Sequence, residues 1–211
     1  MKNFFLIVLL FAFLWPVPSS ANWWDSICRM VAGRAQDWLG AEDKTALLIA
    51  HQKYLAIRKK ENGEGIPPPE KIEVKGVSYK VIQSLGWGSE GDVYKAEGPD
   101  GAVVSIKVFF TEQLLEENIH ALRRKARMGF LTPGILAMQG KTLVMDYVSG
   151  IPVQEILKNN ALGISLELRA KIESELRFRY LGLDPILPEV ILEKNTILDL
   201  ETGRLILIDP H

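Results

Sequence analysis

Cysteine is almost absent from this sequence, because its 211 residues contain only Cys28. A single thiol cannot form a disulfide within the chain, which excludes a disulfide-stapled fold. Cys28 is expected either to be buried as a small hydrophobic residue or to pair with a second chain. Histidine is scarce as well, with three in the chain, and no second histidine or cysteine lies at metal-ligand spacing from His51. His51 is therefore expected to be a hydrogen-bonded packing residue.

An excess of positive charge is also missing. Lysine and arginine together number 25 against 26 aspartates and glutamates, for a formal net charge of −1. Proteins that bind nucleic acid or anionic membranes usually carry a basic excess. Neither partner is expected here.

The N-terminal apolar run is too short to span a membrane. It extends from Phe4 to Trp15, follows the positive start Met1-Lys2-Asn3 and ends before Pro16. A bilayer span needs about 20 residues. Small residues at positions 19–21 complete a pattern typical of a secretory signal peptide, residues 1–21. The sequence thus predicts a secreted or periplasmic protein without a stable membrane span after cleavage; an uncleaved anchor is the alternative.

Residues 22–60 are expected to form an N-terminal extension of two amphipathic helices. Apolar residues of the first recur every three or four positions; they are Trp24, Ile27, Cys28, Val31, Ala35, Trp38 and Leu39. The second begins at Glu42 and Asp43. Residues 61–70 contain three successive prolines, which predicts a linker. We expect the helices to pack on the domain that follows; a membrane- or partner-binding helix is the alternative.

From residue 71 the pattern changes to short strands with one helix over 111–128, then to helices with a terminal hairpin over 196–208. This order predicts an α+β fold in two lobes. The first would contain a five-stranded sheet, and the second a helix over 166–181 and a two-stranded ribbon. The basic residues 123–127 suit the C-terminal end of the helix dipole.

A glycine-rich hairpin lies between two of the predicted strands. Gly86, Gly88 and Gly91 have the spacing G-x-G-x-x-G, and the chain continues as a strand that turns into Val103–Lys107. A dinucleotide-binding fingerprint would open a helix instead. Glycines allow backbone amides to close over phosphates, and Lys107 on the adjacent strand can reach phosphate oxygens. The pattern therefore favours a nucleotide site.

These residues resemble the protein kinase-like superfamily over about residues 77–211. The resemblance implies a two-lobed fold, with an N-lobe over 71–148 and a minimal helical C-lobe over 149–211. It implies ATP and Mg²⁺ as cofactors and a protein as a possible substrate or partner. The segment 143–150 resembles the hinge that binds adenine.

The resemblance also implies roles for single residues. Lys107 and Asp209 would be catalytic, with Lys107 on the α- and β-phosphates and Asn195 and Asp209 as ligands of Mg²⁺. A helix carboxylate, Glu116 or preferably Glu117, would orient Lys107. The other nucleotide-binding residues would be Gly86, Gly88, Gly91, Val93, Met145 and Tyr147.

One position departs from the family pattern. The catalytic aspartate lies five residues before the asparagine in the family, and Val190 occupies that place here. The nearby carboxylates are out of register; they are Asp184, Glu189 and Glu193. An exported phosphotransferase is the first interpretation. A pseudokinase acting as a secreted binding or regulatory module is the second, and another ATP-dependent transferase on the same fold is the third.

Overall fold

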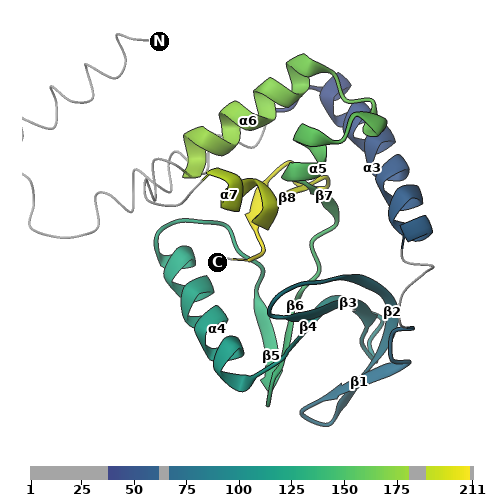
Figure 1. Ribbon diagram of the computed structural model, residues 1–211, viewed down its shortest axis with the longest axis vertical. Coiled ribbons are helices and arrows are strands. Elements are labelled where there is room, and N and C mark those ends of the chain that lie inside the picture. The colour runs from purple at the N-terminus through teal and green to yellow at the C-terminus, as the bar shows by residue number, and fades with distance from the viewer. Residues whose placement is uncertain (1–37, 62–66, 181–188, 210–211) are drawn as a thin grey trace, which may run out of the picture. The chain divides into compact units, whose positions relative to one another are not determined.

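The computed structural model describes residues 38–61, 67–180 and 189–209 (Figure 1). The predicted signal peptide 1–21, Cys28, most of the first predicted helix and part of the predicted linker lie outside these ranges. No helix within the ranges is both long enough and apolar enough to cross a membrane.

Six antiparallel strands form the larger sheet. They are β1 (Lys71–Val74), β2 (Val77–Trp87), β3 (Gly91–Glu97), β4 (Val103–Phe109), β5 (Ile135–Gln139) and β6 (Thr142–Asp146). Their order in the sheet is β1-β2-β3-β4-β6-β5. The prediction of five strands was wrong, because the sheet has six. Lys75 and Gly76 adopt positive φ angles of 53° and 78°, and this tight turn pairs Val74 with Val77.

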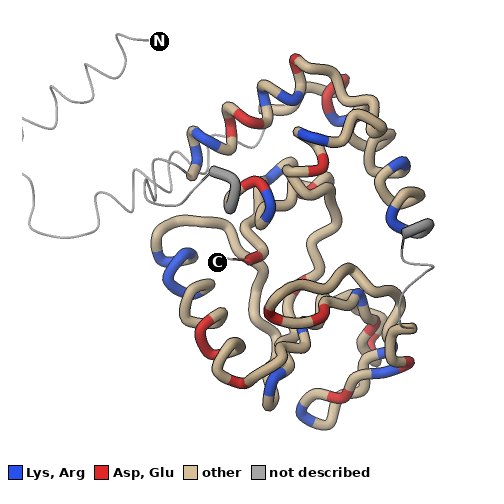
Figure 2. Tube along the Cα trace, viewed as in Figure 1, with Lys and Arg blue, Asp and Glu red and all other residues tan. Residues whose placement is uncertain are grey.

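Helix α4 (Glu112–Arg127) covers part of this sheet, close to the predicted bounds. The hydroxyl of Thr111 accepts a hydrogen bond from the Leu114 amide at 3.2 Å, which caps the first turn. Apolar side chains of the helix pack against β4 and β6; the buried cluster is Phe109, Leu115, Ile119, Leu122, Leu143 and Met145. Figure 2 shows acidic residues near the start of α4 and basic residues near its end, as the helix dipole favours.

A second, smaller sheet has three strands rather than the predicted two. It contains β7 (Gly150–Pro152), β8 (Thr196–Asp199) and β9 (Leu205–Leu207), in that order. The extra strand β7 approaches β8 so closely that a Cβ on Gly150 would lie 2.1 Å from the Leu198 carbonyl oxygen. Glycine therefore permits the third strand, and periodicity over three residues gave no signal for it.

Helices surround the smaller sheet. They are α3 (Ala41–Glu61), α5 (Val153–Lys158), the 3₁₀ helix η2 (Asn160–Leu162), α6 (Leu166–Tyr180) and α7 (Glu189–Asn195). One buried cluster joins α3 to this layer, through Leu47 and Ala50 of the helix and Leu39 just before it. The Trp38 indole also donates to the Gly203 carbonyl oxygen at 2.9 Å. The expected packing of the N-terminal extension on the helical part is confirmed for its second helix.

The predicted α+β class is therefore confirmed at its coarser level: an antiparallel sheet with a flanking helix, and helices around a small ribbon. All described residues belong to one compact unit, Ala35–His211.

Candidate functional site

The glycine-rich segment is a hairpin between β2 and β3, as its sequence context predicts. The Gly88 amide donates to the Gly91 carbonyl oxygen at 3.0 Å and closes the turn. Gly91 lies so close to β4 that a Cβ would come within 2.1 Å of the Val108 carbonyl oxygen. A Cβ on Gly88 would meet nothing within 4 Å. The hairpin thus has a tightly packed base and an open turn.

Lys107 on β4 lies beneath this hairpin and is 8% exposed. Its Nζ is 2.6 Å from Glu90 Oε2 and 2.9 Å from Asp209 Oδ2. The same ammonium lies 4.6 Å from the centre of the Phe109 ring. Two carboxylates and one aromatic ring therefore fix its position.

Asp209 contacts Lys107 from a distant part of the chain, shortly after β9. The Leu207 amide donates to the Leu131 carbonyl oxygen at 2.8 Å, and the Ile208 amide donates to the Asn195 carbonyl oxygen at 2.7 Å. These bonds fix the backbone directly before Asp209. The Asn118 amide nitrogen lies 3.4 Å from Asp209 Oδ1. The structure thus brings together two predicted catalytic residues that are 102 positions apart in the chain.

The predicted partner of Lys107 on α4 is not found in contact with it. Glu116 and Glu117 are exposed, and Glu117 accepts a hydrogen bond from the Gln113 side chain at 2.8 Å. Successive residues of a helix are turned by about 100°, and the buried face of α4 carries Asn118 rather than Glu117. In this structure Glu117 therefore makes no contact with Lys107 that would support its predicted role.

Two neighbours of the site were missed by sequence reasoning. Glu90 lies inside the glycine motif itself, where only the glycines were interpreted. Asn118 is a polar residue, 1% exposed, on the buried face of α4 next to Ile119. A polar residue within an apolar helix face could have indicated this neighbour of the site, because buried amides need hydrogen-bond partners.

The other predicted nucleotide residues lie on neighbouring strands. Val93 on β3 pairs with Lys107, and Met145 on β6 pairs with Ser105 on the other side of β4. Met145 is buried in the cluster between the sheet and α4. Tyr147 follows β6, and the Lys95 ammonium lies 4.4 Å from the centre of its ring.

Helix α3 approaches the start of the glycine hairpin. Arg58 Nη2 lies 2.5 Å from the Leu85 carbonyl oxygen, and a Cβ on Gly86 would lie 3.4 Å from that nitrogen. On the same helix, His51 is partly buried, and burial followed by the charge of Lys95 lowers its pKa. The neutral form of the histidine is thus favoured.

Asn195 ends α7, and Val190 belongs to the same helix. The carboxylate of Glu193 pairs with Lys158 at 2.7 Å. Asp184 and the side chain of Glu189 lie outside what the structure describes. Among the described residues, no three His, Cys, Asp or Glu side chains form a group suited to a metal ion.

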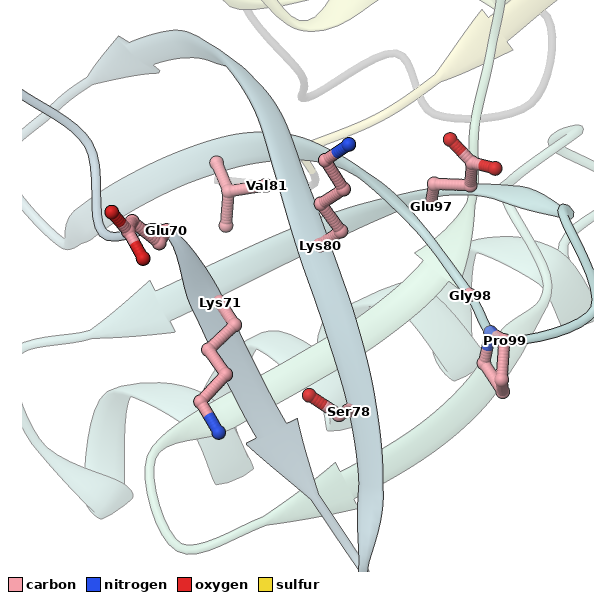
Figure 3. Close-up of a pocket in the computed structure, with 8 residues that line it drawn as sticks. All are labelled: Glu70, Lys71, Ser78, Lys80, Val81, Glu97, Gly98 and Pro99. Atoms are coloured by element: carbon pink, nitrogen blue, oxygen red, sulfur yellow. The ribbon is translucent and has the colours of Figure 1, made fainter.

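A separate depression lies on the larger sheet (Figure 3). Its volume is about 570 Å³, and its lining consists of Glu70, Lys71, Ser78, Lys80, Val81, Glu97, Gly98 and Pro99. Lys71 pairs with Glu73 beside it, and both side chains are more than half exposed. Neither Lys107 nor Asp209 lines this depression, so it is not part of the candidate site.

The chain matches no family model and no curated protein.

Proposed function

We propose that the protein binds ATP together with Mg²⁺ at Lys107 and belongs functionally with the kinase-like phosphotransferases. The observation that carries this proposal is the 2.9 Å contact between Lys107 and Asp209 beneath the glycine hairpin. A lysine under a glycine-rich turn suits phosphate oxygens. An aspartate beside it suits a divalent cation that bridges to those phosphates.

The residues present fit such a nucleotide. Lys107 contributes one positive charge, and Glu90 and Asp209 contribute two negative charges, so the three groups sum to −1. A triphosphate alone would meet net repulsion there, whereas a divalent cation would offset it. Mg²⁺ commonly takes only one or two carboxylates from a protein and keeps several waters or phosphate oxygens. Asp209 with Asn195 would supply such a minimal ligand set.

The test is calorimetric titration of residues 22–211 with ATP, with Mg²⁺ and with a chelator. ATP is expected to bind at least about tenfold more tightly with Mg²⁺, which is the size of one charge-assisted interaction. Lys107→Met should weaken ATP binding by a similar factor. Lys80→Met, at an exposed position on β2, serves as the control. A wild-type protein that binds no ATP at millimolar concentration would contradict the proposal.

The second candidate function is a nucleotide-binding regulatory module that transfers no phosphate. Two features of α7 favour it. Val190 stands at the position of the family's catalytic aspartate, and the carboxylate of Glu193 is paired with Lys158. A missing general base costs about 10²–10⁴ in rate. Measuring phosphate transfer to protein acceptors, for the wild type and for Val190→Asp, separates the two candidates.

The proposal includes export, because residues 1–21 have the pattern of a secretory signal peptide. Under this proposal the protein would act on ATP after its delivery to a compartment that contains the nucleotide.

A further inference from the structure

Lys107 takes its charge partner from the glycine hairpin rather than from helix α4. Glu90 Oε2 lies 2.6 Å from its Nζ, the shorter of its two carboxylate contacts. The inward position of α4 is occupied by Asn118, whose amide faces Asp209 at 3.4 Å. Glu90 of the hairpin thus forms an ion pair with Lys107, whereas Asn118 of α4 places a neutral N–H donor beside Asp209.

The backbone of Glu90 is fixed to the sheet. Its carbonyl oxygen accepts a hydrogen bond from the Phe110 amide at 2.8 Å, and the next residue, Gly91, pairs with Phe109. The missing Cβ of Gly91 allows this close approach of β3 to β4. Glu90 is therefore the last residue of the turn, and its backbone is anchored to β4 at the point where β3 begins.

We propose that Glu90 is a positioning residue that shares the Lys107 ammonium with Asp209 and thereby leaves Asp209 able to bind a divalent cation. An ammonium has three N–H donors and turns toward whatever acceptors surround it. Without the charge of Glu90, Lys107 would pair more strongly with Asp209 and compete with the cation for that carboxylate. The proposal rests on the proposed nucleotide function.

The test measures how strongly Mg²⁺ enhances ATP binding. Wild type and Glu90→Gln, both as residues 22–211, are titrated with ATP in Mg²⁺ and in chelator, and the ratio of the two dissociation constants is compared. Glutamine keeps the size of the side chain but removes its charge. The ratio is expected to fall roughly tenfold in Glu90→Gln, the effect of one charged hydrogen bond. Affinity for adenosine, which carries no phosphate, should stay unchanged.

Two further variants separate this role from a structural one. Glu97→Gln makes the same change at the exposed end of β3 and should keep the wild-type ratio. Glu90→Asp keeps the charge and should retain more of the Mg²⁺ enhancement than Glu90→Gln. Melting temperatures without ligand verify that each variant is folded.

The outcomes are distinct. Tighter ATP binding by Glu90→Gln in both buffers would overturn the proposal, because Glu90 would then block the phosphate position. Equal ratios for Glu90→Gln and Glu97→Gln would also overturn it while leaving the proposed function intact. A wild type that binds no ATP would contradict the proposed function itself.

Discussion

The three glycines of the hairpin differ in how their surroundings limit substitution by a larger residue. Gly86 has a φ of 150°, a conformation that side chains rarely adopt. Gly91 has an ordinary φ but no room, because the Val108 backbone occupies the place of a Cβ. Gly88 has open space around it. Only Gly88 therefore remains to be explained by a ligand rather than by the fold.

Substitutions by alanine should separate these constraints. Gly91→Ala is expected to destabilise the protein by more than about 2 kcal/mol, because the backbone of β4 must move to admit the methyl group. Gly88→Ala should change the free energy of unfolding by no more than about 0.5 kcal/mol. Urea denaturation followed by circular dichroism measures both. Equal losses for the two variants would contradict the packing described for the hairpin.

Among the elements, helix α3 joins the helical layer to the start of the glycine hairpin. Leu47 and Ala50 are buried against the second sheet and its helices, while Arg58 reaches the Leu85 carbonyl oxygen. Lys53 also approaches the Leu162 carbonyl oxygen at 3.4 Å. This helix is therefore an integral part of the core and not an appended segment.

Neighbouring leucines on α3 give a matched test of that conclusion. Leu47 is 1% exposed and Leu48 is 54% exposed. Leu47→Ala should cost about 2–5 kcal/mol, because it leaves a cavity in the core. Leu48→Ala should lie within about 0.5 kcal/mol of wild type. A Leu47→Ala variant as stable as Leu48→Ala, in thermal or urea unfolding, would show that α3 does not pack in solution as it does here.

The elements with strong periodicity were predictable from sequence, and those fixed by tertiary contact were not. Helix α4 and the β8–β9 hairpin were found near their predicted bounds, since capping and alternation are local signals. Strand β7 depends on a close approach at Gly150 that no local pattern encodes. Helix α7 was not predicted either.

Side chains of the candidate site show the same division. Lys107 and Asp209 were predicted and are in contact, because the spacing of a motif is readable from sequence. The predicted helix partner Glu117 does not contact Lys107, because the phase of α4 turns Asn118 inward instead. Buried Arg169 was also missed. It donates to the Leu157 and Asn159 carbonyl oxygens, and composition alone would place such a charge on the surface.

On the scale of the whole molecule, the small sheet depends on contacts from distant parts of the chain. Trp38 donates to Gly203 in the β8–β9 turn, and the Leu131 carbonyl oxygen accepts from Leu207. The Tyr180 hydroxyl donates to the Leu205 carbonyl oxygen at 2.5 Å. Asp209 lies two residues after the end of β9, so these contacts position the strand that leads to Lys107. Loss of the candidate site should therefore accompany global unfolding.

Tyr180 makes that global stability depend on pH. Its ring stacks on Phe130 with centroids 4.8 Å apart, and the side chain is 2% exposed. Burial raises the pKa of Tyr180 well above its usual value, and the charge of Arg179 opposes this only in part. The folded state thus retains the phenol proton to higher pH than the unfolded state, where tyrosine titrates near about pH 10. The contribution of this group to the free energy of unfolding is therefore fully present below about pH 10 and is lost as pH rises further.

Tyr180→Phe should lower stability at neutral pH by about 1–2 kcal/mol through the lost hydrogen bond. It should also flatten the decline between about pH 10 and 11.5, measured by urea unfolding at each pH. An equally steep decline in the variant would mean that another group governs alkaline unfolding.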